Sequence, residues 1–131
     1  MPNRANDWMT QAERNLEMAA TSAKAVLHEW ACFGAQQAAE AAVKALHQSR
    51  GQEAGSQLVR QLLESLPPAI SVPAGLLDDA RALDLHYLSA RYPSGHVRGS
   101  AGENYGPLQS REAIAHARQI VEFCRLQMAQ S

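Results

Sequence analysis

The chain has 131 residues, 46% of them hydrophobic, which suits one compact domain with a real core and excludes a disordered chain. A formal net charge of −1 excludes a global field that would attract nucleic acid. Only 5% of the residues are aromatic, and alanine dominates the apolar set, so the composition favours closely packed helices over a sheet.

Two long helices are predicted in the first third of the chain. The first has Asn6 or Asp7 as its cap and continues to about Leu27, because apolar residues recur at helical spacing. The second runs from about Glu29 to Ser49, and Gly51 is a plausible stop. The second segment is rich in alanine and glycine on several faces, so we expect it at the centre of a bundle or in a subunit interface.

Proline residues mark the ends of the next two predicted helices. A short helix follows Ser56, its possible cap, and ends at Pro67. A fourth helix starts near Pro73 and runs to Arg91, where Pro93 stops it.

The segment 93–109 contains several Gly and Ser residues and a further Pro, and it reads as a long loop. Long ordered loops are often functional. Ser110 is the predicted cap of the last helix, and no strand pattern is seen. The sequence therefore predicts one domain, residues 1–131, with an all-α fold: an antiparallel (up-and-down) four-helix bundle with an additional short helix.

The cysteines and the hydropathy pattern indicate where the protein resides. Cys32 and Cys124 fall on apolar helical positions, which is typical of buried thiols in a reducing cytoplasm. The chain shows no Cys/His ligand spacing, no signal peptide and no apolar run long enough to span a bilayer. We expect a cytoplasmic protein with no metal, no cofactor and no membrane contact.

Two stretches of sequence resemble a known family. These are FGAQQAAEAAVKAL (Phe33–Leu46) and ARYP (Ala90–Pro93), and the helix order and the last helix are also similar. Together they resemble the HEPN (higher eukaryotes and prokaryotes nucleotide-binding) domains, specifically the "RYP" branch. The resemblance implies a helical bundle that usually forms a homodimer. Some members act with a small nucleotidyltransferase as a toxin–antitoxin pair, others are metal-independent ribonucleases, and others are thought to bind nucleotides without cutting.

The resemblance also points to candidate site residues. Nuclease-type members carry an Arg, four to six residues, and then a His, and Arg91 and His96 match that spacing. Many members carry Glu-x-x-x-Lys on the second helix, which Glu40 and Lys44 match. As a functional pair, Lys44 would contact phosphate and Glu40 would orient it. Tyr92 stands where nuclease-type members usually have another polar residue, and Gly55–Leu58 reads GSQL where many relatives read GHxL.

The chemistry of RNA cleavage without a metal explains why these residue types matter. The ribose 2′-OH attacks phosphorus, so a base must take its proton and an acid must protonate the leaving 5′-oxygen. Histidine suits both proton transfers, and arginine suits the charge that develops on phosphorus. One chain offers one Arg91 and one His96, so this mechanism needs a homodimer. Arg98 would help to hold phosphate, and Tyr105 could stack on a base.

Each candidate also has a purely structural interpretation. The positive charge of Arg91 interacts favourably with the helix macrodipole because it lies in the last turn of a helix. His96 and Arg98 can be solvated surface groups. Glu40 and Lys44 can form an ordinary surface ion pair, and Tyr105 can anchor the loop. Three other histidines (His28, His47 and His116) are predicted to be surface or satisfied groups. His86 could face the same groove as Arg91, but helix geometry puts it on a different side of the helix.

Three functions follow from these alternatives. The leading one is a domain that binds a nucleotide or RNA phosphate and is the partner of a small nucleotidyltransferase in a two-component, toxin–antitoxin type system. The second is a metal-independent ribonuclease toxin that uses Arg91 and His96 across a homodimer. The third is a non-catalytic protein-interaction module.

Overall fold

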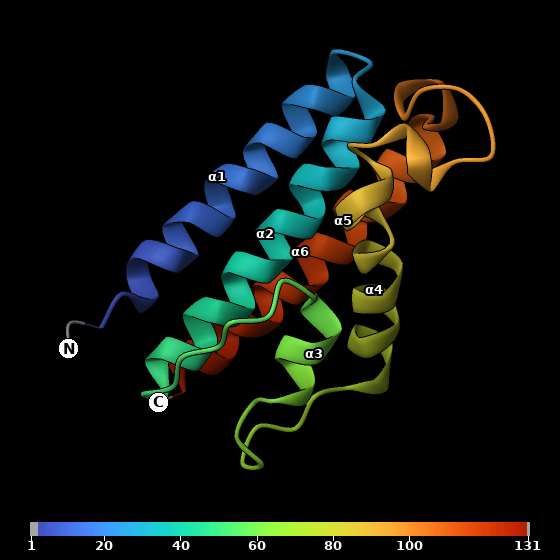
Figure 1. The fold of residues 1–131 in the computed structure, drawn as a ribbon. Coiled ribbons are helices and arrows are strands. Elements are labelled where there is room, and N and C mark those ends of the chain that lie inside the picture. The colour runs from blue at the N-terminus through green and yellow to red at the C-terminus, as the bar shows by residue number, and fades with distance from the viewer. Residues whose placement is uncertain (1–2, 131) are drawn as a thin grey trace.

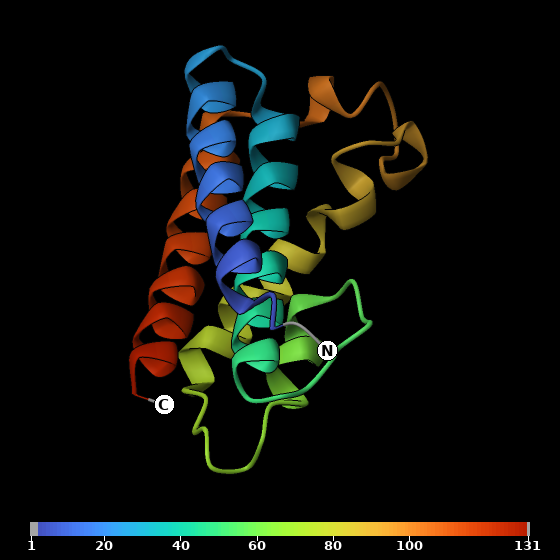
Figure 2. The same ribbon diagram turned by 90° about the vertical axis from the view of Figure 1, so that its left-hand side faces the viewer.

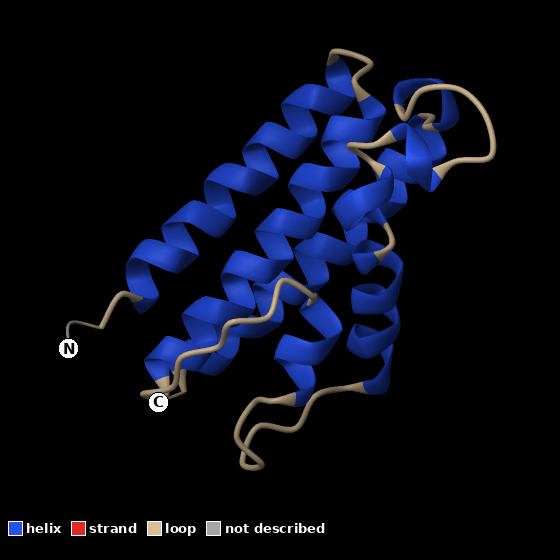
Figure 3. Cartoon of the chain, in the orientation of Figure 1, coloured by secondary structure: helices blue, strands red, loops and turns tan. Residues whose placement is uncertain are grey.

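The computed structural model describes residues 3–130, and every regular element within that range is helical (Figure 3). Three long helices, α1 (Ala5–Lys24), α2 (His28–Ser49) and α6 (Pro107–Ala129), lie side by side. The fourth position of the bundle is filled by α4 (Ala74–Asp84) and α5 (His86–Ser89), and the short α3 (Val59–Glu64) packs beside them (Figure 1). The predicted all-α bundle is confirmed.

Helix α2 lies at the centre, as its alanine-rich sequence predicts. It contacts α1, α6 and all three shorter α-helices. A Cβ added at Gly34 would lie 2.7 Å from the Met18 methyl group and 3.3 Å from the Ala19 Cβ. The absence of a side chain at Gly34 therefore lets α1 and α2 approach closely. Cys32 and Cys124 are both buried in the core around α2.

Helices α1 and α3 end three residues or fewer before the predicted Leu27 and Pro67, at Lys24 and Glu64, and three further differences have a clear physical reason. Helix α1 begins at Ala5, before Asn6 and Asp7, and the Asn3 side chain accepts the Ala5 N–H at 2.8 Å. Helix α6 begins at Pro107 instead of after Ser110, because proline suits the first helical position and the Gln109 side chain accepts the Gly106 N–H at 2.6 Å. Gly51, with φ +74°, follows the end of α2 as predicted.

The third difference concerns the helix predicted to run to Arg91. It is interrupted at Leu85, and α5 ends at Ser89. Just before the interruption, the Asp84 carboxylate accepts the Val59 N–H at 2.8 Å and the Arg60 N–H at 3.0 Å. Asp84 thereby caps α3 from a helix distant in sequence and fixes α3 against α4.

The segment after α5 folds back on the bundle instead of forming an open loop. It contains two 3₁₀ turns, η1 (Pro93–Gly95) and η2 (Gly102–Asn104). It lies at the end of the bundle that also carries the α1–α2 turn, away from the two chain termini (Figure 2). Within the described residues, no helix is both long and apolar enough to cross a membrane.

Candidate functional site

Arg91 follows α5, and its guanidinium is held in a cage of aromatic rings. The centre of the guanidinium lies 4.5 Å from the Phe33 ring centroid, 4.8 Å from that of Tyr87 and 5.2 Å from that of Tyr92. Its Nε and Nη2 donate to the Tyr87 carbonyl oxygen at 2.9 and 2.6 Å. Among the described residues no group accepts a hydrogen bond from Nη1.

His96 is anchored to the end of the same helix. Its Nε2 lies 2.6 Å from the Ser89 carbonyl oxygen. A carbonyl can only accept, so Nε2 carries the hydrogen and, in the neutral ring, Nδ1 is the basic nitrogen. A Cβ added at Gly95 would lie 2.9 Å from the Ser89 Cα, which is closer than real Cβ contacts allow. Gly95 therefore lets the turn sit against α5 closely enough for this bond to form.

The structure brings Arg91, His96 and Arg98 to one end of the bundle. Arg91 and His96 bond to carbonyl groups two residues apart, at Tyr87 and Ser89, although no bond joins their own side chains. Arg98 is exposed on the same loop, and its carbonyl accepts the Asn104 side-chain N–H at 2.7 Å. These three residues at one end of the bundle are named the α5-end site below, and that their side chains bind an anion together stays a prediction.

Tyr105 contacts two histidines, one of which belongs to the α5-end site. Its hydroxyl lies 2.7 Å from His86 Nδ1, and its ring meets the His96 ring edge-on with centroids 5.8 Å apart. Burial, with a smaller effect from nearby His116, lowers the pKa of His86 to about 4. Burial, with a smaller effect from Cys32, raises the pKa of Tyr105 to about 12. Both groups are therefore neutral near pH 7, and the base-stacking role suggested for Tyr105 stays a prediction.

Glu40 and Lys44 form a buried pair, so the interpretation as a surface pair is wrong. Their side chains are 7% and 12% exposed, and Lys44 Nζ lies 3.0 Å from Glu40 Oε2 and 5.3 Å from the Trp8 ring centroid. Burial raises the pKa of Glu40, although the Lys44 hydrogen bond and charge oppose that shift. The pair is enclosed because small residues of α2 bring α1 close.

The buried pair is remote from the α5-end site within one chain. Lys44 lies eleven residues after Phe33 on the same helix, which corresponds to about 16 Å along its axis. Phe33 is the α2 residue that contacts Arg91. A phosphate contact for Lys44 therefore stays a prediction, and it is not one that the Arg91 site of the same chain can share.

The remaining histidines are satisfied, as predicted. His28 Nδ1 lies 2.9 Å from Ser110 Oγ, and His116 Nδ1 lies 2.9 Å from Asp79 Oδ1. His86 faces Tyr105 and not the neighbours of Arg91, in agreement with the angle predicted between them.

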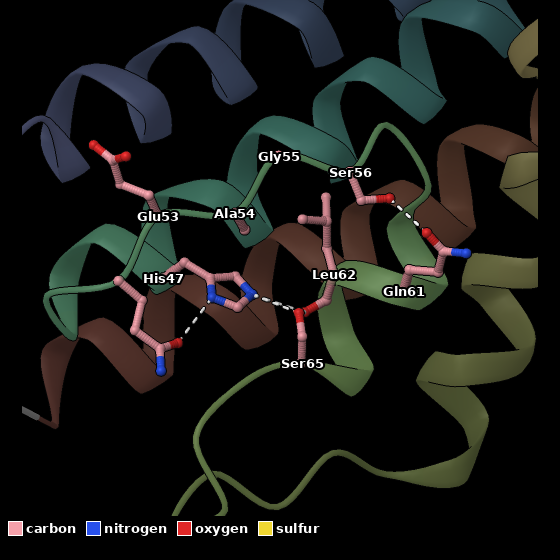
Figure 4. A pocket seen from close by; sticks show the side chains of 9 residues that line it. His47, Glu53, Ala54, Gly55, Ser56, Gln61, Leu62 and Ser65 are labelled. Atoms are coloured by element: carbon pink, nitrogen blue, oxygen red, sulfur yellow. Dashed lines mark hydrogen bonds between the residues drawn. The ribbon is translucent and has the colours of Figure 1, made fainter.

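A pocket between the end of α2 and α3 contains the fourth of these histidines (Figure 4). His47 Nδ1 lies 3.0 Å from the Gln52 side-chain oxygen, and Nε2 lies 2.8 Å from the Leu62 carbonyl oxygen. Ser56, at the position of the histidine in GHxL relatives, donates to the Gln61 side chain at 2.8 Å. His47, Gln52, Ser56 and Gln61 are thus engaged in hydrogen bonds, whereas the Glu53 carboxylate, which also lines the pocket, takes part in none of them.

Comparison with known proteins identifies the family. A family model described as "HEPN domain" matches residues 5–127. The chain belongs to the HEPN family. A crystal structure of a Thermus thermophilus protein superposes with a TM-score of 0.94 at 43% identity, covering 96% of this chain and 99% of the other. A comparison with curated proteins found no match.

Two further solved structures carry the HEPN name. An archaeal HEPN homologue has a TM-score of 0.83 at 35% identity, covering 97% of this chain and 99% of its own. An HEPN domain protein of Thermotoga maritima has a TM-score of 0.78 at 29% identity, covering 95% and 99%.

Sequence reasoning missed the aromatic cage of Arg91. One local signal was available, because Tyr87 and Arg91 stand four residues apart, the spacing at which side chains meet on a helix. The contribution of Phe33 had no such signal, since it comes from α2. In the folded chain Phe33 contacts Trp30 and Tyr87 as well as Arg91.

Proposed function

We propose that this HEPN domain binds a nucleotide or RNA phosphate at the α5-end site, and that it acts with a small nucleotidyltransferase in a two-component, toxin–antitoxin type system. The observation that supports binding most directly is the state of Arg91. Its fork is fixed by the Tyr87 carbonyl and three aromatic rings, while Nη1 has no acceptor among the described residues. A guanidinium oriented in advance binds phosphate with less loss of side-chain entropy.

A second copy of the chain completes the proposed site. Large apolar side chains are exposed on α2, between α4 and α5, on α5 and on the loop that follows it: Trp30, Leu85, Leu88, Tyr92 and Val97. Exposed apolar side chains gathered in one region are typical of an interaction surface. A homodimer formed through this region would bring two copies of Arg91, His96 and Arg98 together, and would concentrate positive charge that one chain lacks.

The tautomer of His96 favours a second candidate function, metal-independent RNA cleavage. With hydrogen on Nε2, the Nδ1 atom of one copy can take the proton of the ribose 2′-OH. The 2′-oxygen then bonds to phosphorus while the bond to the 5′-oxygen breaks, and the protonated His96 of the second copy supplies the proton of that leaving oxygen. Arg91 stabilises the added negative charge on the phosphorane.

Binding and cleavage can be tested with the same three proteins. Fluorescent ATP and a fluorescent RNA are titrated against wild type, Arg91→Ala and, as the matched control, Arg14→Ala, which removes a highly exposed arginine on α1. Loss of a charge-assisted hydrogen bond predicts at least about tenfold weaker binding by Arg91→Ala and no weakening by the control. Equal affinity in all three proteins would refute the phosphate site.

Cleavage is measured in EDTA with wild type and His96→Ala. The ribonuclease function requires activity that is lost in the variant, whereas binding without cleavage supports the leading function. A stable complex with a nucleotidyltransferase but no nucleotide binding would favour the third function, a protein-interaction module. Analytical ultracentrifugation of wild type and Leu88→Glu tests the homodimer, because a charge in the apolar surface is expected to dissociate it.

A further inference from the structure

We propose that Tyr105, held in place by His86, is a positioning residue that fixes the ring orientation of His96. This inference rests on the proposed function of the α5-end site, since it concerns how one of its groups is presented to a ligand. His86 and Tyr105 belong to α5 and to the segment before α6, and they meet only in the folded chain.

Tyr105 contacts two histidines. Its hydroxyl is 2.7 Å from His86 Nδ1, and the two rings are 5.3 Å apart at an interplanar angle of 59°. The His96 ring is 5.8 Å from the Tyr105 ring at 81°, an edge-on contact. The hydroxyl bond fixes the Tyr105 ring, and the Tyr105 ring in turn limits the rotation of His96.

The surroundings of this pair keep it in place. Residue Gly102 of η2, three residues before Tyr105, packs against α2 so closely that a Cβ there would lie 2.6 Å from the Glu29 carboxylate. The titratable groups near the pair are His116 of α6, which bonds to Asp79 of α4, and Cys32 of α2. Burial, with a smaller contribution from Glu29, raises the pKa of Cys32 to about 12, so that group is neutral near pH 7.

As a consequence, only one ring nitrogen of His96 is available to a ligand. Its Nε2 bonds to the Ser89 carbonyl oxygen at 2.6 Å, and a turn of the ring by half a revolution would break that bond, because the carbon Cε1 would then take the place of Nε2. The Tyr105 ring opposes this turn because it stands against the edge of the imidazole. Nδ1 is thereby kept as the nitrogen available to a ligand, as carbonyl and carboxylate partners do for other functional histidines.

The test is a long-range ¹H–¹⁵N NMR spectrum of the histidine rings, recorded on the full chain at pH 8 without RNA. The wild type is expected to show His96 almost entirely as the Nε2–H tautomer. Tyr105→Leu removes both the hydroxyl and the ring, and a mixture of tautomers is expected. Tyr105→Phe and His86→Phe remove only the bond between the two residues, and a smaller shift in the same direction is expected. Leu108→Ala, at an exposed position nearby, is the control.

The result that would overturn the inference is an unchanged His96 tautomer in all three variants. If Tyr105→Leu does not fold, the two milder variants still decide the question. Since no RNA is present, the spectrum can support this inference even if the wild type proves unable to bind or cleave RNA. Where the wild type does cleave RNA, Tyr105→Phe is expected to lower kcat by about tenfold with KM unchanged, since small displacements of a reacting group reduce the rate strongly.

Discussion

Replacing Lys44 by methionine is expected to destabilise the domain by about 3 kcal/mol at pH 7, because it leaves the Glu40 carboxylate buried without its cation. The Glu40 side chain is 7% exposed, and its remaining partner is Gln37, whose amide donates at 3.3 Å. The contact of Lys44 with the Trp8 ring is lost as well. Methionine fills most of the volume of lysine, so the loss reflects charge more than a cavity.

The pH dependence of this loss distinguishes an electrostatic cause from a packing cause. Burial raises the pKa of Glu40 above its ordinary value of 4.5, and removing Lys44 raises it further because the Lys44 charge opposes the shift. The folded variant then binds more protons than the unfolded chain between the two pKa values, so its stability falls as pH rises through that window. The destabilisation is therefore greatest at pH 7 and shrinks as pH falls towards 4.5.

Urea unfolding at pH 7 and pH 4.5 measures both effects. Glu40→Gln, which keeps the shape and an acceptor for Lys44, is expected to change stability by less than about 1 kcal/mol. The double variant Lys44→Met/Glu40→Gln is expected to recover at least half of the loss seen in Lys44→Met. A Lys44→Met protein within about 1 kcal/mol of wild type, or one whose loss is the same at both pH values, would refute the reasoning.

Three further predictions concern the segments around α5. Gly95→Ala is expected to lower the free energy of unfolding by about 1 to 3 kcal/mol, because the new Cβ must move away from the Ser89 Cα. NMR should then show a weaker hydrogen bond from His96 to Ser89. An unchanged melting temperature together with an unchanged imidazole spectrum would contradict this prediction. Burial lowers the pKa of His86 from 6.5 to about 4, so the unfolded chain binds the proton before the folded chain does as pH falls. The free energy of unfolding is therefore expected to fall by up to about 3 kcal/mol between pH 6.5 and about pH 4. Urea midpoints should therefore fall more steeply with acid in wild type than in His86→Gln. Asp84→Ala removes the cap of α3 and is expected to cost about 2 kcal/mol, with faster amide exchange confined first to the start of α3; equal exchange in both proteins would argue against the capping role.

The sequence predicted the helices well because a helix shows itself in the spacing of apolar residues a few positions apart. Apolar periodicity placed α2 within one residue of its observed start, and Gly51 marked its end. The errors fell at helix termini, where the partner of a backbone group comes from elsewhere in the chain. Asp84 shows this most clearly, since it caps α3 while belonging to α4, and no pattern around Val59 indicates it.

The sequence likewise predicted some features of the candidate site and not others. The spacing of Arg91 and His96 was readable because both lie in one short stretch, and the structure places both at the end of α5. The exposure of a side chain and the identity of its neighbours were not readable, so Glu40 and Lys44 were as consistent with a surface pair as with a functional one. Their burial depends on tertiary packing, since α1 lies against α2 and places the Trp8 ring 5.3 Å from Lys44 Nζ.

The sequence by itself determined that the protein is an all-helical HEPN domain and that an arginine and a histidine stand close together after its fourth bundle segment. The tertiary structure alone decided what those two side chains contact. It surrounds Arg91 with Phe33 from α2, and it sets the Tyr105–His86 pair behind His96. The physical reason is that periodicity and spacing act over a few residues, whereas a cation cage and a ring support require segments distant in the chain to pack against one another.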